Sequence, residues 1–540
     1  MNSTHLHFQD VLSMNVPMPD NNMPKADSDR ADVFLFERIS DKAEHVFARS
    51  SSAQLTTDND ITCLLDSREN FPAWLKAMAQ AQHTICIEMY IFATDAFGQK
   101  VREVLLERLH NGVQVFLIYD WLGSSGAHYK RFFKPLTAAG AHIHAYNKLG
   151  LTTGLSILGR NHRKSFTIDQ KVAFVSGLCI SSQWDGNEKQ GISPWRDTGL
   201  MLQGPIVQDV LQAFLDTWQS MGLAKPAVLL QAAPSDAATQ VDDYAEKLSD
   251  VNNADSSKPK SFANARLVAT TADNANMMRL DLLAVSMARK TLWITDAYFM
   301  PTRMYAQGLI NAAKDGVDVR VLVPSTSDIK WIGAVSRTQY RTLLEAGVRV
   351  FEWNGSMIHA KMSVVDGMWA RVGSTNLNFS SWFANRELDV AIEDRATVDY
   401  LEQCYLRDLA NSTEVVLDEK SQAKLVAERA KMQYKQALKS GLNRTQRQKA
   451  LQKMAQLSGA LDAMIHGSRV VDNNEAWAYL SIGLALLVFA VLLYFLPQLL
   501  LWPVLFLLVI GGGAATLHAC KRLYQLRQQS LSHGNNQPEQ

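Results

Sequence analysis

Cysteine is scarce in this sequence, and neither sign of charge dominates it. Among 540 residues there are five scattered cysteines without any Cys-x-x-Cys pair: Cys63, Cys86, Cys179, Cys404 and Cys520. That number and spacing argue against a disulfide framework and a thiolate zinc site, and favour a reducing compartment. The 54 Lys and Arg residues against 53 Asp and Glu residues leave a formal charge of +1, which indicates neither a general nucleic-acid binder nor an acidic disordered chain.

Charged residues are absent altogether from residues 476–520. A helix needs about 20 apolar residues to cross a bilayer, so this length predicts two transmembrane helices, 476–496 and 499–520, joined as a hairpin. The first 30 residues lack an apolar run, and we therefore expect neither a signal peptide nor an N-terminal span.

A basic segment precedes the expected hairpin. Residues 417–470 contain eleven Lys or Arg residues and four acidic residues, a net charge of +7 (11 − 4). The composition predicts helices at 418–475, beside the membrane, that are attracted to anionic lipid headgroups. Lys521 and Arg522 open the polar tail 521–540 after the second span. Because positive residues stay on the cytoplasmic side, the body that precedes the hairpin is expected to be cytoplasmic.

The body of the chain repeats one pattern of elements. A β-prone run, a helical pattern and a Val-rich run occur at 85–92, 98–109 and 112–119, and again at 291–299, 304–313 and 316–323. In both copies a Gly ends the helix, and the order strand, helix, strand favours parallel pairing of the two strands. We therefore expect two similar α/β halves, 59–236 and 263–417, with a linker at 237–262 and a polar extension at 1–58.

One motif stands at corresponding places in the two halves. Each copy reads His-x-Lys-x-x-x-x-Asp: His162, Lys164 and Asp169 in the first half, and His359, Lys361 and Asp366 in the second. A looser form of this pattern is expected by chance only about 0.13 times in a chain of this composition, so two copies within a repeat carry weight. The surrounding alternation is typical of a strand, on which His and Lys two residues apart project from one face. Two such strands brought together predict one pocket with two His and two Lys.

This set of side chains suits chemistry on a phosphodiester. Attack on that anion needs a nucleophile, a proton donor for the leaving alkoxide and fixed positive charge on the non-bridging oxygens. One imidazole can attack phosphorus while the other transfers protons, and Lys164 and Lys361 can hold the phosphoryl oxygens without a metal. Asp169 and Asp366 lie at an odd offset from the lysines, so we expect them to brace the motifs from the opposite strand face.

A catalytic His also needs an acceptor for its second ring nitrogen. Each half has a candidate downstream, Asp197 in Trp-Arg-Asp and Glu387 in Asn-Arg-Glu. Ser374 and Asn376, in the sequence Gly-Ser-Thr-Asn, are candidates for binding phosphate. Any one of these residues alone is more often structural or solvated, and the paired recurrence is what singles out the two His and the two Lys.

The motifs resemble those of the phospholipase D superfamily, and their surroundings resemble its bacterial cardiolipin synthase branch. The resemblance covers residues 59–394 and includes, besides the two motifs, Tyr90-Ile-Phe92, Leu122-Gly-Ser124, Trp195-Arg-Asp197, Ala297-Tyr-Phe-Met-Pro301 and Gly373-Ser-Thr-Asn376. It implies two pseudo-twofold-related α-β-α sandwich halves with mixed sheets, one active site between them, no metal or cofactor, and a phosphohistidine intermediate. It further implies an enzyme of the bacterial inner membrane that transfers a phosphatidyl group between phospholipids, typically making cardiolipin and glycerol from phosphatidylglycerol.

The chain departs from the family pattern in two respects. Cys179 stands where the first half of family members usually carries Asn, which predicts asymmetric phosphate binding. The expected spans are C-terminal, whereas many members of the branch anchor through N-terminal spans or attach peripherally. Family precedent favours His162 as the nucleophile, and Asp197 is its plausible orienting partner.

Three other functions fit the same residues. Water in place of the lipid alcohol would make the protein a phospholipid hydrolase. A nucleic-acid phosphodiesterase is disfavoured because no basic groove with interleaved aromatic residues is visible outside the basic segment, so no nucleic-acid partner is expected. A non-catalytic membrane scaffold is disfavoured because both His and both Lys are intact. Two motifs in one chain remove the need for a dimer to build the site, but they leave the oligomeric state open.

Overall fold

The computed structural model describes residues 44–148, 159–187, 190–231, 262–417 and 469–470. The expected transmembrane hairpin and the polar tail lie outside these ranges. Nearly all of the basic segment and of the linker, and residues 1–43 of the N-terminal extension, also lie outside them. Within them, no helix is both long and apolar enough to cross a membrane.

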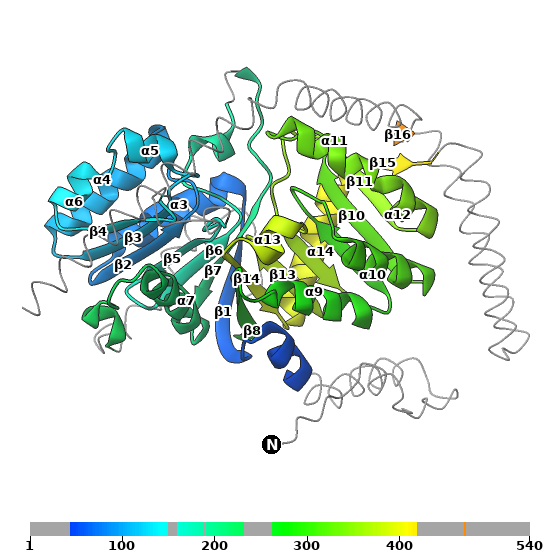
Figure 1. Cartoon of the computed structure of the whole chain (residues 1–540), viewed down its shortest axis with the longest axis horizontal. Coiled ribbons are helices and arrows are strands. Elements are labelled where there is room, and N and C mark those ends of the chain that lie inside the picture. Colours follow the sequence, from blue (N-terminus) through cyan, green and yellow to red (C-terminus); the bar gives the residue numbers. More distant parts are fainter. Residues whose placement is uncertain (1–43, 149–158, 188–189, 232–261, 418–468, 471–540) are drawn as a thin grey trace, which may run out of the picture.

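One mixed sheet of 16 strands runs through both halves (Figure 1). The first half contributes β1 (Thr56–Leu65), β2 (Thr84–Met89), β3 (Gln114–Asp120), β4 (His142–Tyr146), β5 (Lys164–Ile168), β6 (Val172–Ser176) and β7 (Thr198–Gln203). The second contributes β8 (Phe262–Thr270), β9 (Thr291–Thr295), β10 (Asp318–Pro324), β11 (Arg349–Trp353), β12 (Met362–Val365), β13 (Trp369–Gly373), β14 (Glu387–Ile392) and β15 (Ser412–Val416), with β16 (Arg469–Val470) at its far edge. The strand order is β16-β15-β11-β10-β9-β12-β13-β14-β8-β1-β7-β6-β5-β2-β3-β4.

The two halves meet at the antiparallel pair of β1 and β8 in the middle of this sheet. Outward from that pair, the first half runs β7, β6, β5, β2, β3, β4, and the second half runs β14, β13, β12, β9, β10, β11. Equivalent strands therefore follow one another in the same order on both sides. This is the pseudo-twofold arrangement that the sequence repeat predicts.

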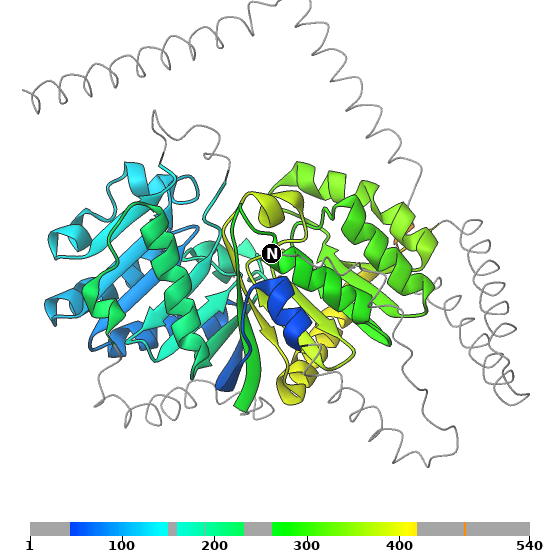
Figure 2. The ribbon, with the colours of Figure 1, turned by 60° about the horizontal axis from the view of Figure 1, so that its bottom comes forward.

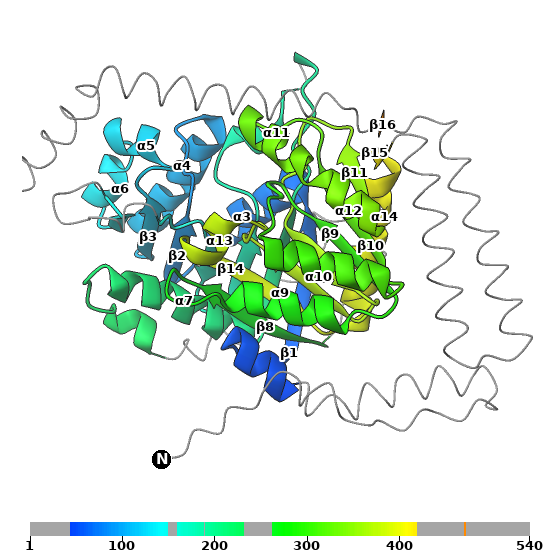
Figure 3. The same cartoon turned by 45° about the vertical axis from the view of Figure 1, so that its right-hand side comes forward.

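Helices cover both faces of the sheet in each half (Figures 2 and 3). In the first half, α3 (Asp66–Gln80) and α4 (Ala96–His110) pack on one face and α7 (Ile206–Ser220) on the other. In the second half, α9 (Asn276–Met287), α10 (Arg303–Lys314) and α12 (Tyr340–Ala346) lie on one face and α14 (Arg395–Ala410) on the other. Short elements occupy the loops: α5 (Ser125–Tyr129), α6 (Lys134–Ala138), η2 (Ser182–Asp185), η4 (Ala227–Leu230), α11 (Lys330–Thr338) and α13 (Phe379–Phe383). The expected mixed α/β sandwich is confirmed.

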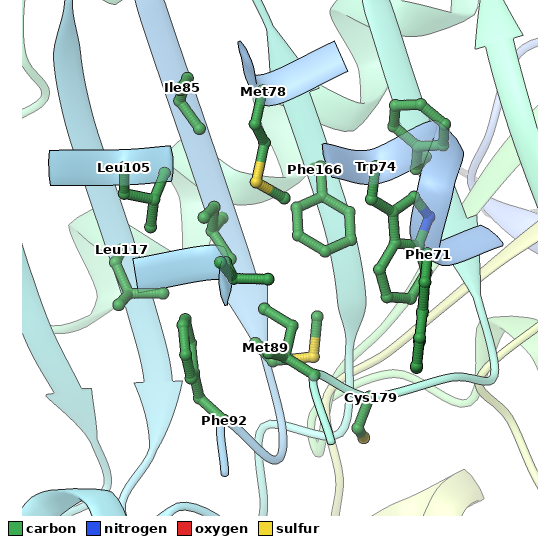
Figure 4. Packing of buried hydrophobic residues seen from close by; sticks show 14 of the residues in the cluster. Phe71, Trp74, Met78, Ile85, Met89, Phe92, Leu105, Leu117, Phe166 and Cys179 are labelled. Atoms are coloured by element: carbon green, nitrogen blue, oxygen red, sulfur yellow. The ribbon is translucent and has the colours of Figure 1, made fainter. Parts of the chain in front are cut away.

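Large apolar side chains fill the space between sheet and helices in the first half. Trp74 of α3 and Leu105 of α4 lie over Ile85 of β2 and Phe166 of β5 (Figure 4). The ring centres of Trp74 and Phe166 are 4.8 Å apart. Full burial of one such side chain contributes about 1.5–3 kcal/mol, so this core holds β2 and β5 firmly against the helices.

The predicted strand, helix, strand order is confirmed in both copies. β2 and β3 are parallel neighbours, as are β9 and β10. Gly112 and Gly316 follow the intervening helices with φ of +85° and +97°, a conformation that glycine adopts without a steric penalty. The first strand of each copy is shorter than its apolar run, because the residues beyond it bond to loops instead. The Tyr90 carbonyl accepts a hydrogen bond from Ser124, and the Tyr298 N–H donates to Asp296.

In each half, the strand registers bring the motif to the end of the sheet at which the parallel strands finish. Lys164 opposes Met89, the last residue of β2, and Met362 opposes Thr295, the last residue of β9. β6 and β13 run antiparallel to β5 and β12, so they also end here, together with β2, β3, β9 and β10. We call this the site end of the sheet. The motifs start just before strands β5 and β12 rather than within them, which differs from the expectation of a continuous strand.

Candidate active site

The two His-x-Lys segments are held by backbone bonds that cross between the halves. The N–H of His162 donates to the carbonyl of Arg386 at 2.9 Å, and the N–H of His359 donates to the carbonyl of Arg196 at 2.6 Å. Each His is thereby pinned to the residue that immediately precedes a candidate acceptor carboxylate of the opposite half. These bonds explain why β5 and β12 begin only after the histidines.

The acceptor carboxylates consequently pair with the histidines of the opposite half. Nδ1 of His162 lies 2.9 Å from Oε2 of Glu387, and Nδ1 of His359 lies 2.8 Å from Oδ2 of Asp197. The expectation that Asp197 orients His162 is therefore wrong. Both predicted acceptors do reach a histidine, and in both pairs the carboxylate lies against Nδ1 rather than Nε2.

Further hydrogen bonds fix both carboxylates. Ser374 donates to Glu387 at 2.6 Å and Asn385 donates to its other oxygen at 3.2 Å, while Trp184 Nε1 donates to Asp197 at 3.0 Å. Burial raises the pKa of each carboxyl group, but the partner histidine and nearby lysines outweigh burial and leave both pKa values below the ordinary range. The acceptors are thus ionised and aimed, as an orienting role requires.

Both motif lysines are buried beside their histidines. Lys164 Nζ donates to the carbonyl of His162 at 2.5 Å, and Lys361 Nζ lies 2.9 Å from Nδ1 and 3.0 Å from Nε2 of His359. Burial lowers the pKa of Lys361 to about 8 and also lowers that of Lys164. The charge of each lysine acts on the histidine of the other half, so the two motifs share one electrostatic site.

Both imidazoles are neutral in the free site. Burial and the charge of Lys361 lower the pKa of His359 to about 4, against the opposing effect of Asp197. Burial also lowers the pKa of His162, against the opposing effect of Glu387. A neutral imidazole is the form that can act as a nucleophile or as a base.

Two tyrosines complete the site symmetrically, and the sequence analysis did not single them out. The ring of Tyr90 meets that of His162 with centres 4.8 Å apart, and Lys164 Nζ lies 5.1 Å from its centre. In the other half the Tyr298 ring lies 5.8 Å from that of His359 and 5.7 Å from Lys361 Nζ. The signal available in the sequence was their common place, directly after the first strand of each repeat.

The motif aspartates do not enter the site. Asp169 accepts hydrogen bonds from the backbone N–H groups of Gln82, His83 and Thr84 at 2.7–2.8 Å. Asp366 accepts from those of Arg289, Lys290 and Thr291 at 2.6–2.8 Å. Each carboxylate therefore ties the turn after the motif strand to the start of β2 or β9. This is the bracing role that the odd offset predicts, and neither aspartate is assigned a part in the chemistry.

The candidate phosphate-binding pair is divided between two roles. Ser374 is committed to the carboxylate of Glu387 and also accepts from the N–H of Leu388 at 2.9 Å, so its placement as a phosphate ligand is not supported. Asn376 is buried, and its Oδ1 has no hydrogen-bond partner among the described residues. Cys179, at the equivalent position of the first half, is buried against the core (Figure 4), and the charges of Lys164 and Lys361 act on its thiol. The asymmetric phosphate binding expected from Cys179 stays a prediction.

Two buried arginines inside the motifs connect the halves, and sequence reasoning missed both. Arg163 donates from Nε to the carbonyl of Glu387 at 3.1 Å. Arg196 donates from Nε to both carboxylate oxygens of Asp408 at 2.8 and 3.0 Å. They fill the variable positions of His-x-Lys and Trp-x-Asp. Arg163 corresponds to Ala360 and so has no signal in the repeat, whereas Arg196 corresponds to Arg386, a recurrence that could have been noticed. Across the ranges that the structure covers, no cluster of His, Cys, Asp and Glu is arranged to hold a metal ion.

The chain is similar in sequence to known proteins. A family model described as "Cardiolipin synthase, PLD-like domain" matches residues 74–213 and 283–409, which contain both motifs and both acceptors. Cardiolipin synthase 2 of Bacillus anthracis is 30% identical over 373 residues, 68% of this chain and 68% of that protein. Cardiolipin synthase A of Pseudomonas aeruginosa is 29% identical over 374 residues, 69% of this chain and 71% of that protein.

A similar solved structure is a phosphatidylserine synthase of Haemophilus influenzae, with a TM-score of 0.49 and 15% sequence identity. The match covers 66% of this chain and 87% of that one.

Proposed function

Because the chain belongs to the family of phospholipase D-like cardiolipin synthases, we propose that it transfers a phosphatidyl group from one phospholipid molecule to a hydroxyl group of another. The donor and the acceptor in this proposal are two molecules of phosphatidylglycerol, and the products are cardiolipin and glycerol. The observation that carries the proposal is the pairing of two neutral imidazoles, each oriented by an ionised carboxylate of the opposite half and each beside a buried lysine.

The reaction runs in two steps in this account. Binding of the anionic phosphodiester raises the pKa of one histidine, which takes up a proton at Nε2. Nε2 of the first, neutral histidine then attacks phosphorus, the bond to the glycerol oxygen breaks, and the other histidine gives its Nε2 proton to the departing glycerol. A phosphatidyl group is then bound to the first histidine. In the second step the other histidine removes the proton from a hydroxyl group of the incoming phosphatidylglycerol, whose oxygen attacks phosphorus and releases the histidine. Both steps conserve protons because the same imidazole donates and then accepts.

The remaining side chains stabilise the transition state or hold the reacting groups. We assign Lys164 and Lys361 to the non-bridging oxygens, where a buried ammonium group is most effective against developing charge. Asn376 is buried and is assigned to the phosphate side of the site, where its amide NH2 group can donate to a phosphate oxygen. Asp197 and Glu387 hold the imidazoles in one tautomer and stabilise the positive charge that each acquires.

The membrane context of this proposal rests on sequence. The expected C-terminal hairpin would hold the catalytic halves at the inner membrane on its cytoplasmic face, where the substrate is concentrated in the lipid layer. The net charge of +7 in residues 417–470 (11 − 4) would add attraction to anionic headgroups.

Product analysis tests the proposed function. The full chain in membranes is supplied with phosphatidylglycerol labelled in the glycerol headgroup, and lipids and water-soluble products are resolved by mass spectrometry. We expect cardiolipin and labelled glycerol in equal amounts. Phosphatidic acid without cardiolipin would identify a hydrolase, and unchanged lipid together with cleavage of a nucleic-acid substrate would identify a nuclease.

The pH dependence of this activity should have an alkaline limb set by Lys361. Its ammonium form predominates below a pKa of about 8, so kcat/KM should fall as the pH rises through that value. On the acid side His359 stays neutral down to a pKa of about 4, so its protonation should leave the rate unaffected near pH 6. A profile that is flat to pH 10 would contradict the assignment of Lys361.

Replacement of Ser374 by Ala separates a positioning role from phosphate binding. Loss of its 2.6 Å hydrogen bond to Glu387 should lower kcat about tenfold and leave KM for phosphatidylglycerol nearly unchanged. Thr375→Ala is the neighbouring comparison, because Thr375 bonds to Asp389 rather than to a histidine-orienting carboxylate. A rise in KM at constant kcat for Ser374→Ala would return this residue to the phosphate.

A further inference from the structure

Large apolar side chains are exposed around the mouth of the site. Leu122, Tyr129, Ile192, Met304, Phe379 and Phe383 are all exposed, with Tyr129 at 69% and Phe379 at 65% of their full accessible area. All six belong to loops at the site end of the sheet: two follow β3, one lies between β6 and β7, one follows β9, and two lie between β13 and β14. We call these six residues the apolar rim.

Residues next to the rim contact two tyrosines of the candidate active site. Asn378, which precedes Phe379 and caps α13, donates to the carbonyl of Tyr298 at 3.2 Å. On the other side, Gly123 follows Leu122 and packs so closely on Tyr90 that a Cβ atom would come within 2.8 Å of the tyrosine ring. The chain neighbours of Phe379 and Leu122 therefore contact the two tyrosines of the site, one in each half.

The rim lies across both halves rather than on one of them. α13, which carries Phe379 and Phe383, lies between the helices of the first half and those of the second half in Figures 1 and 3. Its two phenylalanine rings are 5.0 Å apart and form one apolar knob. α5, which carries Tyr129, lies at the upper end of the molecule in Figure 1, as does α11. Scattered single apolar side chains are ordinary on a protein surface, but a group gathered around one mouth is not.

In three of the four loops that carry the rim, the charge has one sign, whereas the loop of Ile192 also contains Asp185 and Glu188. The three loops 121–133, 297–305 and 374–386 carry five of the six rim residues and contain Lys130, Arg131, Arg303 and Arg386 but no Asp or Glu. Lys130, Arg131 and Arg303 are exposed next to Tyr129 and Met304. In a chain whose total charge is +1, three acid-free loops with four cations around one mouth are a local feature.

We propose that the apolar rim docks into the interfacial layer of an anionic lipid bilayer and delivers the headgroup of a lipid to the histidines. Apolar and aromatic side chains enter the boundary between headgroups and acyl chains, and adjacent Lys and Arg residues meet the anionic phosphates, each contributing about 1 kcal/mol. Neither a protein partner nor a nucleic acid accounts for both features, because an apolar ring with cations beside it matches a surface that is apolar below and anionic above. This inference rests on the proposed function and adds the docking surface through which the substrate arrives.

The rim has a natural control on the same molecule. Phe262 is 82% exposed at the start of β8, where it opposes Asp60, and β8 reaches the level of Glu387 only at its other end, at Thr270. Phe262 therefore lies at the opposite end of the sheet from the site. Substitutions there remove as much exposed aromatic surface without touching the mouth.

A kinetic test compares two physical forms of one substrate. Phe379→Ser combined with Phe383→Ser in the full chain should reduce cardiolipin formation from phosphatidylglycerol in bilayers about tenfold or more, and leave unchanged the rate with short-chain phosphatidylglycerol dissolved as monomers. Phe262→Ser should alter neither rate. Equal losses on both forms, or no loss on bilayers, would overturn the docking role, and thermal unfolding of each variant establishes that it is folded.

A second readout does not depend on activity. A spin label is placed at Phe379→Cys or at Phe262→Cys in a Cys520→Ser background, since Cys63, Cys86, Cys179 and Cys404 are buried. In vesicles of phosphatidylcholine and phosphatidylglycerol, the label at position 379 should be open to oxygen and shielded from a water-soluble nickel complex, and the label at position 262 should show the reverse. Equal nickel access at both positions would overturn the proposal. If the protein makes no cardiolipin from either form of substrate, the proposed function fails, and this measurement still decides the docking surface.

Discussion

Replacement of either motif histidine by alanine should reduce cardiolipin formation by about four orders of magnitude or more. One imidazole carries the phosphatidyl group and the other moves the protons, so neither half of the site can proceed alone. His162 and His359 are each held by a carboxylate and a lysine, and among the residues that the structure describes no third histidine bonds to this set. Initial rates with labelled phosphatidylglycerol, at equal amounts of membrane protein, measure the effect.

The control for these substitutions is His110→Ala, at the exposed end of α4. It should keep the full rate. If His162→Ala or His359→Ala retained more than about one per cent of the activity, the two-histidine account would be wrong, because loss of a nucleophile or its proton donor has a larger effect than that.

Asp197→Asn and Glu387→Gln should each lower kcat by about two to four orders of magnitude. Each substitution should also change the environment of the histidine in the opposite half. Replacement of an orienting carboxylate by an amide favours the wrong imidazole tautomer and leaves the imidazolium without its counter-charge. Asp197 contacts His359, and Glu387 contacts His162, so each substitution should alter the histidine of the opposite motif.

The pairing of each carboxylate with the histidine of the opposite half can be tested at each histidine separately. The rate at which diethyl pyrocarbonate modifies each histidine, measured by peptide mapping, should change at His359 in Asp197→Asn and at His162 in Glu387→Gln. Asp216→Asn and Glu345→Gln are controls, since both carboxylates are largely exposed and lie in surface ion pairs. A change at His162 in Asp197→Asn would contradict the observed pairing.

Local sequence pattern predicts most of the fold because each half is made of local units. The run before Gly112 and the run before Gly316 show helical periodicity, and the β-prone and Val-rich runs around them form parallel neighbours. Strand ends were less predictable. Met89 and Thr295 end their strands early because residues just after them bond to loops that lie far away in sequence, Tyr90 to Ser124 and Asp296 to Leu377.

The members of the site were predictable, whereas their pairing was not. His162, Lys164, His359 and Lys361 recur in a pattern that composition alone does not produce. Which carboxylate meets which histidine depends on how the halves dock through β1 and β8, and no local signal records that contact. The same docking hides Arg163, whose guanidinium reaches the backbone of Glu387 across the interface.

Strand alternation predicted the right role for the motif aspartates. Residue type alone predicted the wrong role for Ser374. Asp169 and Asp366 follow the motif lysines at an odd offset, and both bind backbone N–H groups away from the pocket. Ser374 lies in a loop, where alternation carries no information, and its hydroxyl group is used by Glu387. Residue type alone therefore could not tell a phosphate ligand from a support for the acceptor.

Trapping of the covalent intermediate tests the central claim most directly. The full chain is mixed with phosphatidylglycerol labelled at phosphorus, quenched in alkali after a fraction of one turnover, and mapped by mass spectrometry. Label on the ring nitrogen of His162 or His359, lost when the labelled histidine is replaced by alanine, is the predicted result. Cardiolipin formation without any labelled histidine, or label on a residue outside these two, would contradict transfer through a phosphohistidine in this site.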